Sequence, residues 1–441
     1  MARLFSDLKV LLLGLLFFLA FQLSAEEVLW PVYGSYALTS VRDLSVALKN
    51  DRRENLWKKI AGLEKHGLKN NSIDKVLQTE EKISAIWIKT LLGLKSKDVY
   101  RIKEAMTEYR ELRQTYPEYM PQRRCFATLS KIHAALRSSL EPVERAQADN
   151  WLINCANRRE ADTDEKTAEY FSAAYRVFAG VACGRMDLST QGKMGLKKFL
   201  LSLNKDAMPT AMEIGVSHFL LENVCQAAEV FAGSGDDLFL MTGDFSKGRD
   251  MIIKAWAMKL AELMTPLDIL PGRGWEKDAL FSPKAAFILA CRYSVAIMDL
   301  EKAANADPCA AAFYYTRAYR AAPINDLPLL SSPVGTGWLV ARSRVRKGLE
   351  ARYARLITVS GGRFGDLLSI AFNGGEKPLM GRTSQQDGSS KIGRDYFTHT
   401  IASSTVAIDH KKQKAAGRQG IRGTSMNPYR DRHTYQNKRH R

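Results

Sequence analysis

The stretch KDVYRIKEAMTEYRELRQTY (97–116) decides how the rest of the chain is interpreted. Its apolar residues are spaced three and four apart, so in a helix they would share one face, with charged residues opposite. Pro117 follows directly, and a proline ring cannot continue a helix. The spacing therefore predicts an amphipathic helix over 97–116, with one buried face made of Val99, Ile102, Met106, Tyr109 and Leu112.

The same helical spacing recurs over most of the chain. No group of neighbouring segments alternates apolar and polar residues as a half-buried sheet does, and 238–241 is the one candidate for a short strand. We therefore predict an all-α body over 40–372, built of helical hairpins packed as an α-solenoid or an irregular bundle. A subdomain break is expected near 184–192 or 266–278. The other predicted helices cover 40–50, 53–66, 72–94, 121–138, 143–158, 163–182, 191–204, 210–232, 247–264, 279–305, 308–321, 336–358 and 363–372.

Two segments share a spacing that resembles the second helix of a tetratricopeptide repeat. In that family a small residue lies at a helix crossing, an aromatic residue fills a groove, and a proline ends the helix. Leu92 and Gly93 stand where the family has its Leu–Gly pair, although Trp87 is displaced by two residues. The resemblance implies a helical array with a concave surface for a protein partner. The two segments are Ala105, Tyr109, Leu112 and Pro117, and Ala311, Tyr315, Ala318 and Pro323.

The first 25 residues have the order of a secretory signal peptide. Arg3 and Lys9 precede an apolar run over 10–21, and the small pair Ser24–Ala25 follows. The apolar run is shorter than the roughly 20 residues that cross a bilayer, which favours cleavage over the alternative of an uncleaved anchor. We predict a signal peptide over 1–25, an extended segment over 26–39, and an exported protein, periplasmic or secreted, with no further membrane span.

Six cysteines remain after cleavage. An even number in an oxidising compartment permits disulfides, and we expect pairing between neighbours in sequence. The alternative is that they are small core residues. No Cys-x-x-Cys pair and no zinc-type Cys–His spacing is present, so no metal site or cofactor is predicted. The cysteines are Cys125, Cys155, Cys183, Cys225, Cys291 and Cys309.

The C-terminal segment 373–441 is polar and strongly basic, which predicts disorder. The net charge of the chain is +18, and 411–441 holds ten basic residues against one acid. Aromatic residues interleave with the charges, a pattern that suits nucleic acid, lipid headgroups or anionic polymers. Export favours an anionic envelope polymer or lipid headgroup; the alternative is a solvated tail without a partner. The ten residues are Lys411, Lys412, Lys414, Arg418, Arg422, Arg430, Arg432, Lys438, Arg439 and Arg441.

Catalytic motifs are not recognisable, and no catalytic residue is predicted. His218 and Glu222 stand four apart on an apolar helix and could hold a metal, but a core histidine is the favoured interpretation. The segment 233–250 is interpreted as a polar connection. The segment 371–375, AFNGG, resembles the A-Y-N-A-G segment of lytic transglycosylases, but no catalytic Glu in an E-S context is found upstream.

The function that this sequence predicts is an exported helical scaffold or adaptor that binds a protein partner, with its basic tail on an anionic surface. Two alternatives stay open at this stage. One is an exported hydrolase of the cell wall without a readable motif. The other is a nucleic-acid-binding component of an envelope transfer system.

Overall fold

The computed structural model describes the central part of the chain. The predicted signal peptide, the predicted extended segment, the predicted helix over 40–50, and residues 375–376 and 381–441 of the predicted tail lie outside the described residues. The disorder predicted from residue 373 onward is wrong for 373–374 and 377–380, which belong to the strands Ile370–Gly374 and Lys377–Met380. Those described are 54–66, 75–116, 125–158, 165–209, 214–232, 235–270, 279–324, 327–332, 338–344, 347, 350–357, 370–374 and 377–380.

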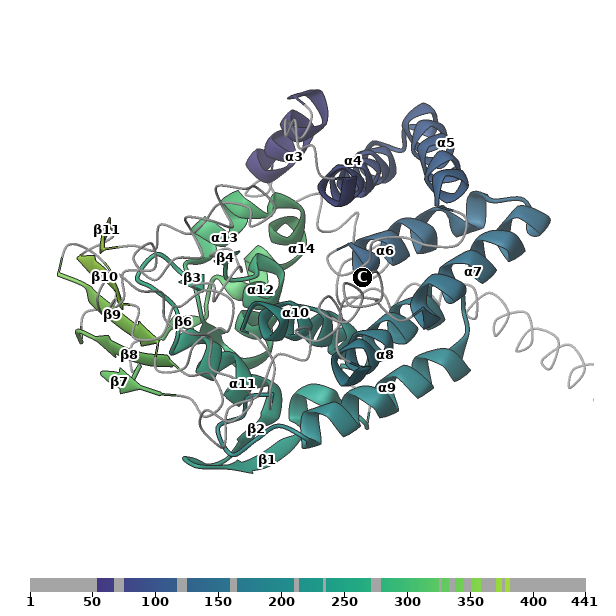
Figure 1. The fold of residues 1–441 in the computed structure, drawn as a ribbon. Coiled ribbons are helices and arrows are strands. Elements are labelled where there is room, and N and C mark those ends of the chain that lie inside the picture. The colour runs from purple at the N-terminus through teal and green to yellow at the C-terminus, as the bar shows by residue number, and fades with distance from the viewer. Residues whose placement is uncertain are drawn as a thin grey trace, which may run out of the picture. The chain divides into compact units, whose positions relative to one another are not determined.

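The described residues are mostly helical, which confirms the helical part of the prediction (Figure 1). None of their helices is both long enough and apolar enough to cross a membrane. Two short 3-10 helices, η3 (Arg137–Ser139) and η4 (Leu238–Leu240), add to the α-helices. The α-helices are α3 (Glu54–His66), α4 (Lys75–Ser96), α5 (Val99–Thr115), α6 (Phe126–Leu136), α7 (Pro142–Asn157), α8 (Glu165–Ala182), α9 (Met186–Leu201), α10 (Ile214–Val230), α11 (Ile252–Ala261), α12 (Pro283–Tyr293), α13 (Leu300–Ala306) and α14 (Pro308–Ala318).

Helix α5 corresponds to the amphipathic helix predicted over 97–116. Asp98 caps it, accepting hydrogen bonds from the backbone N–H groups of Tyr100 and Arg101, as an N-cap aspartate does. Its buried face consists of Ala105, Met106, Tyr109 and Leu112. The expected burial of Val99 is wrong, because this residue lies in the first turn and is largely exposed.

The chain forms two compact units that interleave along the sequence. Unit 1 contains Met1–Arg158, Tyr175–Lys193 and Glu229–Ser234, and unit 2 contains Arg159–Ala174, Met194–Ala228 and Gly235–Arg441. The division passes through α8, α9 and α10. Within unit 1, α4 packs against α3, α5 and α6.

The all-α class is wrong for the last part of unit 2. Segments 336–358 and 363–372 were predicted as helices, and their described residues contain strands of a five-stranded sheet in the order β11-β10-β9-β8-β7, with every neighbouring pair antiparallel (Figure 1). Segment 233–250 contains a β-hairpin, β1 with β2, and the candidate strand at 238–241 is largely the 3-10 helix η4. The strands are β1 (Thr242–Phe245), β2 (Gly248–Met251), β3 (Ile269–Leu270), β4 (Ala279–Leu280), β5 (Val295–Ala296), β6 (Ala322–Pro323), β7 (Leu330–Ser331), β8 (Trp338–Arg342), β9 (Arg352–Ile357), β10 (Ile370–Gly374) and β11 (Lys377–Met380).

The buried residue Arg355 interrupts the alternation of apolar and polar residues that would have predicted the strand β9. Tyr353 and Arg355 are both buried on one face of β9. The Arg355 guanidinium lies 4.9 Å from the ring centroid of Trp338 on β8, a cation–π contact that offsets the cost of burying the charge. Arginine, alanine and leucine all favour helices, and an arginine is expected to be exposed. For this reason the sequence of β9 predicted a helix and not a strand.

The helix predicted over 279–305 is interrupted. Ser282 caps α12 with its hydroxyl and Pro283 occupies the first turn. Ser294 then takes a left-handed backbone conformation with φ of 55°, and β5 follows directly. A capping aspartate, Asp299, then begins α13. The local caps therefore divide one predicted helix into two.

Candidate functional site

The predicted tail and repeat-motif residues are only partly among the described residues, and those described lie in different elements. The ten tail residues and Pro117 are outside the described residues, as is the side chain of Tyr315. Ala311 and Ala318 are buried in α14. Pro323 does not directly follow that helix but belongs to β6, which pairs in parallel with β5.

The disulfides considered from the sequence are not formed in the structure. All six cysteines are described and none is bonded to another. Two thiols face other polar atoms instead. Cys291 Sγ lies 3.8 Å from the carbonyl oxygen of Tyr314, and Cys183 Sγ lies 3.7 Å from that of Asp149.

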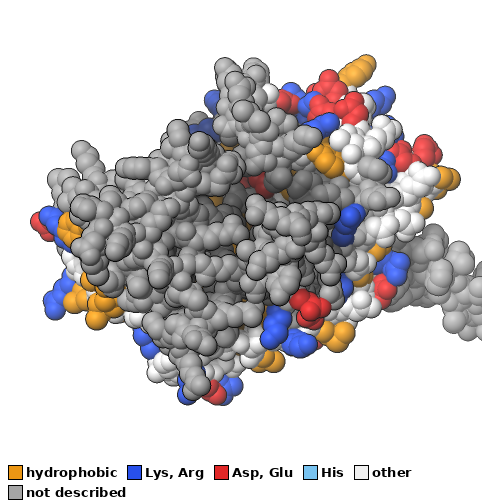
Figure 2. Space-filling model, viewed as in Figure 1, with side chains coloured by type: hydrophobic (Ala, Val, Ile, Leu, Met, Phe, Trp, Pro, Cys, Tyr) orange, Lys and Arg blue, Asp and Glu red, His pale blue; other side chains and the backbone are white. Residues whose placement is uncertain are grey.

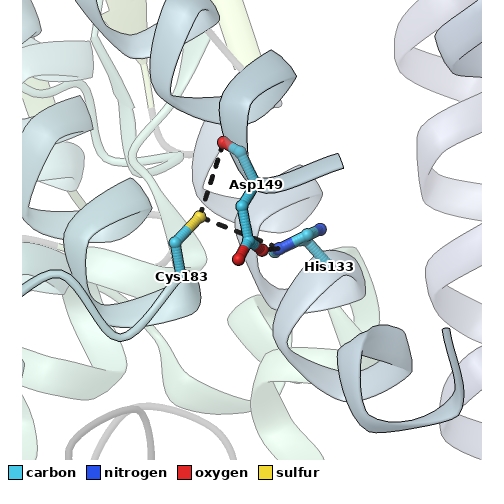
Figure 3. A group of neighbouring side chains, drawn as sticks. All are labelled: His133, Asp149 and Cys183. Carbon is cyan, nitrogen blue, oxygen red and sulfur yellow. Dashed lines mark hydrogen bonds and ion pairs between the residues drawn. The ribbon is translucent and has the colours of Figure 1, made fainter. Parts of the chain in front are cut away.

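A cluster of donor atoms lies in unit 1, where three helices supply one side chain each (Figure 3). His133 comes from α6, Asp149 from α7, and Cys183 directly follows the last residue of α8. His133 Nε2 is 2.7 Å from Asp149 Oδ1 and 3.8 Å from Cys183 Sγ. The three donor atoms all lie within 4.8 Å of one another. We call these residues the donor cluster.

A tyrosine fixes the other side of the imidazole. The hydroxyl of Tyr109, from α5, is 2.9 Å from His133 Nδ1, and both side chains are buried. Burial lowers the pKa of His133, although Asp149 opposes the shift, so the ring is neutral at pH 7. The consistent arrangement has Tyr109 donating to Nδ1 and Nε2–H donating to Asp149.

An arginine holds the carboxylate of the cluster. Arg137 donates from Nε and Nη2 to Asp149, with a closest distance of 2.9 Å. Burial alone would raise the pKa of Asp149, but hydrogen bonds from His133 and Arg137 and their charges outweigh it and lower the pKa to about 2. Asp149 is therefore an anion at neutral pH.

The thiol of the cluster is not activated for nucleophilic attack. Burial, and next the nearby charge of Asp149, raise the pKa of Cys183 well above its usual range. The thiol and the carboxylate also meet the same imidazole nitrogen, whereas a nucleophile–base–acid relay uses opposite nitrogens. The geometry suits a structural network or a ligand set rather than a catalytic triad.

A second buried histidine lies in unit 2. His218 Nε2 accepts a hydrogen bond from the backbone N–H of Ser282 at 2.6 Å, as expected for a core histidine. Glu222 accepts from the Ser282 hydroxyl at 2.7 Å and pairs with Lys284 at 3.4 Å. These groups hold the start of α12 against α10, because Ser282 also caps α12 through Ala285 N–H.

The sequence drew attention to His218 and gave no sign of the donor cluster. His218 and Glu222 have helical i, i+4 spacing, which is visible without a fold. His133, Asp149 and Cys183 are 16 and 34 residues apart along the chain, and no metal or catalytic motif has those spacings. Only the packing of α6, α7 and α8 brings them together.

The helix pairs α4–α5 and α8–α9 are joined by the same turn. The carbonyl of Gly93 accepts from Asp98 N–H at 2.9 Å, and that of Gly180 accepts from Arg185 N–H at 2.6 Å. The residue before each donor has a positive φ, as a Schellman motif requires. These residues are Lys97, with φ of 56°, and Gly184, with φ of 69°.

The helices approach closely after each turn. A Cβ atom on Gly93 would lie 2.8 Å from Ile102 Cδ1, and one on Gly180 would lie 2.5 Å from Ser189 N. In both pairs the contacted residue is nine positions after the glycine. The turn thus recurs 87 residues apart with the same hydrogen bond, the same left-handed backbone conformation and a close contact with the residue at the same position, which involves a side chain at Ile102 and the backbone at Ser189.

Large apolar side chains are exposed where three helices of unit 1 begin. They occupy the first two positions of α5, α7 and α9. A solvent-exposed apolar residue costs little singly, but a recurring position suggests a contact surface. These residues are Val99, Tyr100, Val143 and Met186, with 63%, 83%, 73% and 57% of their surface exposed.

No protein-family model matches this chain, and no curated protein matches it either.

Proposed function

We propose that the protein is an exported, non-enzymatic helical scaffold that binds a protein partner through unit 1 and an anionic surface through its basic tail. The observation that carries the proposal is the recurrence of one hairpin turn in α4–α5 and α8–α9. A recurring turn is typical of stacked helical hairpins, in which each pair buries its apolar face on the next.

The packing of α4 supports a stacked arrangement. This helix contacts its own hairpin partner α5 and also α6, the first helix of the next pair. Contacts of this kind between first helices build a helical solenoid. Ala105, Tyr109 and Leu112 of the repeat-like segment are buried on α5, and burial of these positions is what the tetratricopeptide resemblance implies.

The partner surface is the edge formed by the beginnings of α5, α7 and α9. In a stack of antiparallel hairpins, alternate turns lie along one edge, so the four exposed apolar residues would form a row. On the face in Figure 2, acidic and basic side chains lie together over the region of α5, with hydrophobic ones between. Apolar anchors within a polar rim are typical of protein interfaces.

The tail supplies the second contact. Ten basic residues within 411–441 would bind anionic lipid or polymer with a strength that falls as salt rises. Charge of this kind adds to partner affinity without needing a folded structure.

Photo-cross-linking tests the partner surface. A photoreactive residue is placed at Tyr100, at Met186, or at Leu240, an equally exposed apolar residue of unit 2 that serves as the control. The proposal expects the same protein to be cross-linked from Tyr100 and Met186 and not from Leu240. Unrelated cross-links from Tyr100 and Met186, or none from either, would contradict it.

Vesicle binding tests the tail separately. The full chain and a variant with the ten basic residues replaced by Gln are mixed with anionic and with neutral vesicles. We expect binding of the full chain to anionic vesicles alone, weakened by salt and lost in the variant. Equal binding by both chains would exclude the tail as the contact.

A further inference from the structure

We propose that His133, Asp149 and Cys183 form a binding site for Zn²⁺, with three protein ligands and one open coordination position. This inference is independent of the partner-binding proposal. It rests on the convergence of three different donor atoms on one point in unit 1, from three separate helices.

The donor set matches zinc. Imidazole nitrogen, thiolate sulfur and carboxylate oxygen are its three usual ligand types, and catalytic or exchangeable sites often have three protein ligands. Thiolate and imidazole together disfavour Ca²⁺ and Mg²⁺, which take oxygen ligands.

The distances need only a small adjustment. In a tetrahedral site the ligand bond lengths place sulfur and nitrogen about 3.5 Å apart and nitrogen and oxygen about 3.3 Å apart. Cys183 Sγ and His133 Nε2 are 3.8 Å apart. The hydrogen-bonded pair of His133 and Asp149, at 2.7 Å, would open by about half an ångström to admit the ion between them.

Neighbouring groups already stand where outer ligands of a zinc site stand. A metal-bound histidine usually hydrogen-bonds through its other ring nitrogen, and Tyr109 occupies that place on Nδ1. The Tyr109 hydroxyl can donate to Nδ1 when that nitrogen carries no proton, and it can accept from Nδ1–H when the imidazole proton is on Nδ1. Arg137 orients the carboxylate by donating to both of its oxygens, from Nη2 to Oδ2 at 2.9 Å and from Nε to Oδ1 at 3.0 Å. Oδ1 also lies 2.7 Å from His133 Nε2, on the side of the cluster.

The charge balance also fits. Binding of Zn²⁺ breaks the S–H bond of Cys183 and releases one proton to solvent, while the imidazole proton moves from Nε2 to Nδ1. The two positive charges of Zn²⁺ are then balanced by the Cys183 thiolate and the Asp149 carboxylate, and the Arg137 guanidinium lies beside the carboxylate. The ion would tie α6, α7 and the end of α8 together and so stabilise unit 1.

Cobalt substitution tests the site in the full mature chain. Co²⁺ bound by a thiolate gives a sulfur-to-metal charge-transfer band in the near ultraviolet. We expect one Co²⁺ per chain, this band in the wild type, and its displacement by Zn²⁺. Cys183→Ser should lose the band, and Cys155→Ser, which removes a neighbouring buried thiol from α7, should keep it.

Two further variants separate the site from other metal binding. Replacing His399, His410, His433 and His440 by Asn should leave the band unchanged, which excludes the histidines after residue 380 as the ligands. Tyr109→Phe should weaken affinity by about 10–100-fold while keeping the band. A wild-type chain with native circular dichroism and no thiolate band overturns the proposal, as does an unchanged band in Cys183→Ser.

Discussion

Among the described residues, the buried histidines His133 and His218 both stand beside carboxylates, yet the two sites differ in how their donor atoms are arranged. In unit 2, His218 Nε2 and Glu222 are engaged by Ser282 and Lys284, so the group serves to fix α12 on α10. In unit 1, His133, Asp149 and Cys183 direct nitrogen, oxygen and sulfur at one another. The contrast shows that the identity of neighbouring residues says little about ligand binding until the partners of each donor atom are known.

The largest expected effect comes from removing the anion of the donor cluster. Asp149→Ala leaves Arg137 and His133 without their shared acceptor in a largely buried place, and should lower the free energy of unfolding by about 3 kcal/mol. Urea unfolding measures the loss. Glu104→Ala is the control, because its exposed pairing with Lys89 should matter little. A loss as small as that of the control would mean that the cluster does not stabilise unit 1.

The corresponding change in unit 2 should be somewhat smaller. Glu222→Gln weakens charged hydrogen bonds and should cost about 2 kcal/mol at neutral pH. Burial alone would raise the pKa of Glu222, but the charge of Lys284 and the Ser282 hydroxyl lower it below its usual value. A lowered carboxyl pKa stabilises the fold above the unfolded pKa, about 4.3, and that stability is lost as pH falls below it.

The pH dependence distinguishes this role from simple packing. The urea midpoint of the wild type should fall between pH 6 and pH 3.5 by more than that of Glu222→Gln. Parallel curves for the two chains would show that the Glu222 charge contributes nothing to stability.

The recurring turns give a matched pair of substitutions. Gly180→Ala should cost about 1–3 kcal/mol, because its Cβ meets the backbone nitrogen of Ser189 and the backbone oxygen of Arg185. Gly93→Ala should cost less, since its Cβ meets the flexible end of the Ile102 side chain. Thermal unfolding ranks the two, and a larger loss for Gly93→Ala would contradict the close backbone contact at Gly180.

The smallest effect should be a gain. Lys97 holds the left-handed position that Gly184 fills in the other turn, and a side chain is unfavourable there. Lys97→Gly should therefore raise stability by about 0.5–1 kcal/mol, while Gly184→Ala should lower it by a similar amount. Thermal unfolding of both variants checks the opposite signs; a loss in Lys97→Gly would show that the turns are not equivalent.

The predictable part of this fold is its local part. Helix α5 follows from the spacing of Met106, Tyr109 and Leu112. The beginnings of α5, α12 and α13 follow from local capping residues, which are Asp98, Ser282 and Asp299. The strands β8 and β9 could not be predicted, because Arg355 faces inward on Trp338 and only the assembled sheet makes that favourable. The predicted and observed structures differ where the environment of a residue is determined by a segment far away in the sequence.

The candidate site follows the same rule. His218 and Glu222 lie one helical turn apart, which suggested a metal pair. In the structure both bind residues at the start of α12. The donor cluster needs three helices and the turn at Gly184 before its atoms meet, so no periodicity in the sequence could indicate it.

X-ray absorption at the zinc edge of the full chain, loaded with one equivalent of Zn²⁺, tests the contrast between the two histidine sites most directly. The account predicts a first shell with one sulfur at about 2.3 Å and two or three nitrogen or oxygen atoms at about 2.0–2.2 Å. His133→Gln should change that shell and His218→Gln should not. A shell without sulfur, or one altered by His218→Gln and not by His133→Gln, would contradict it.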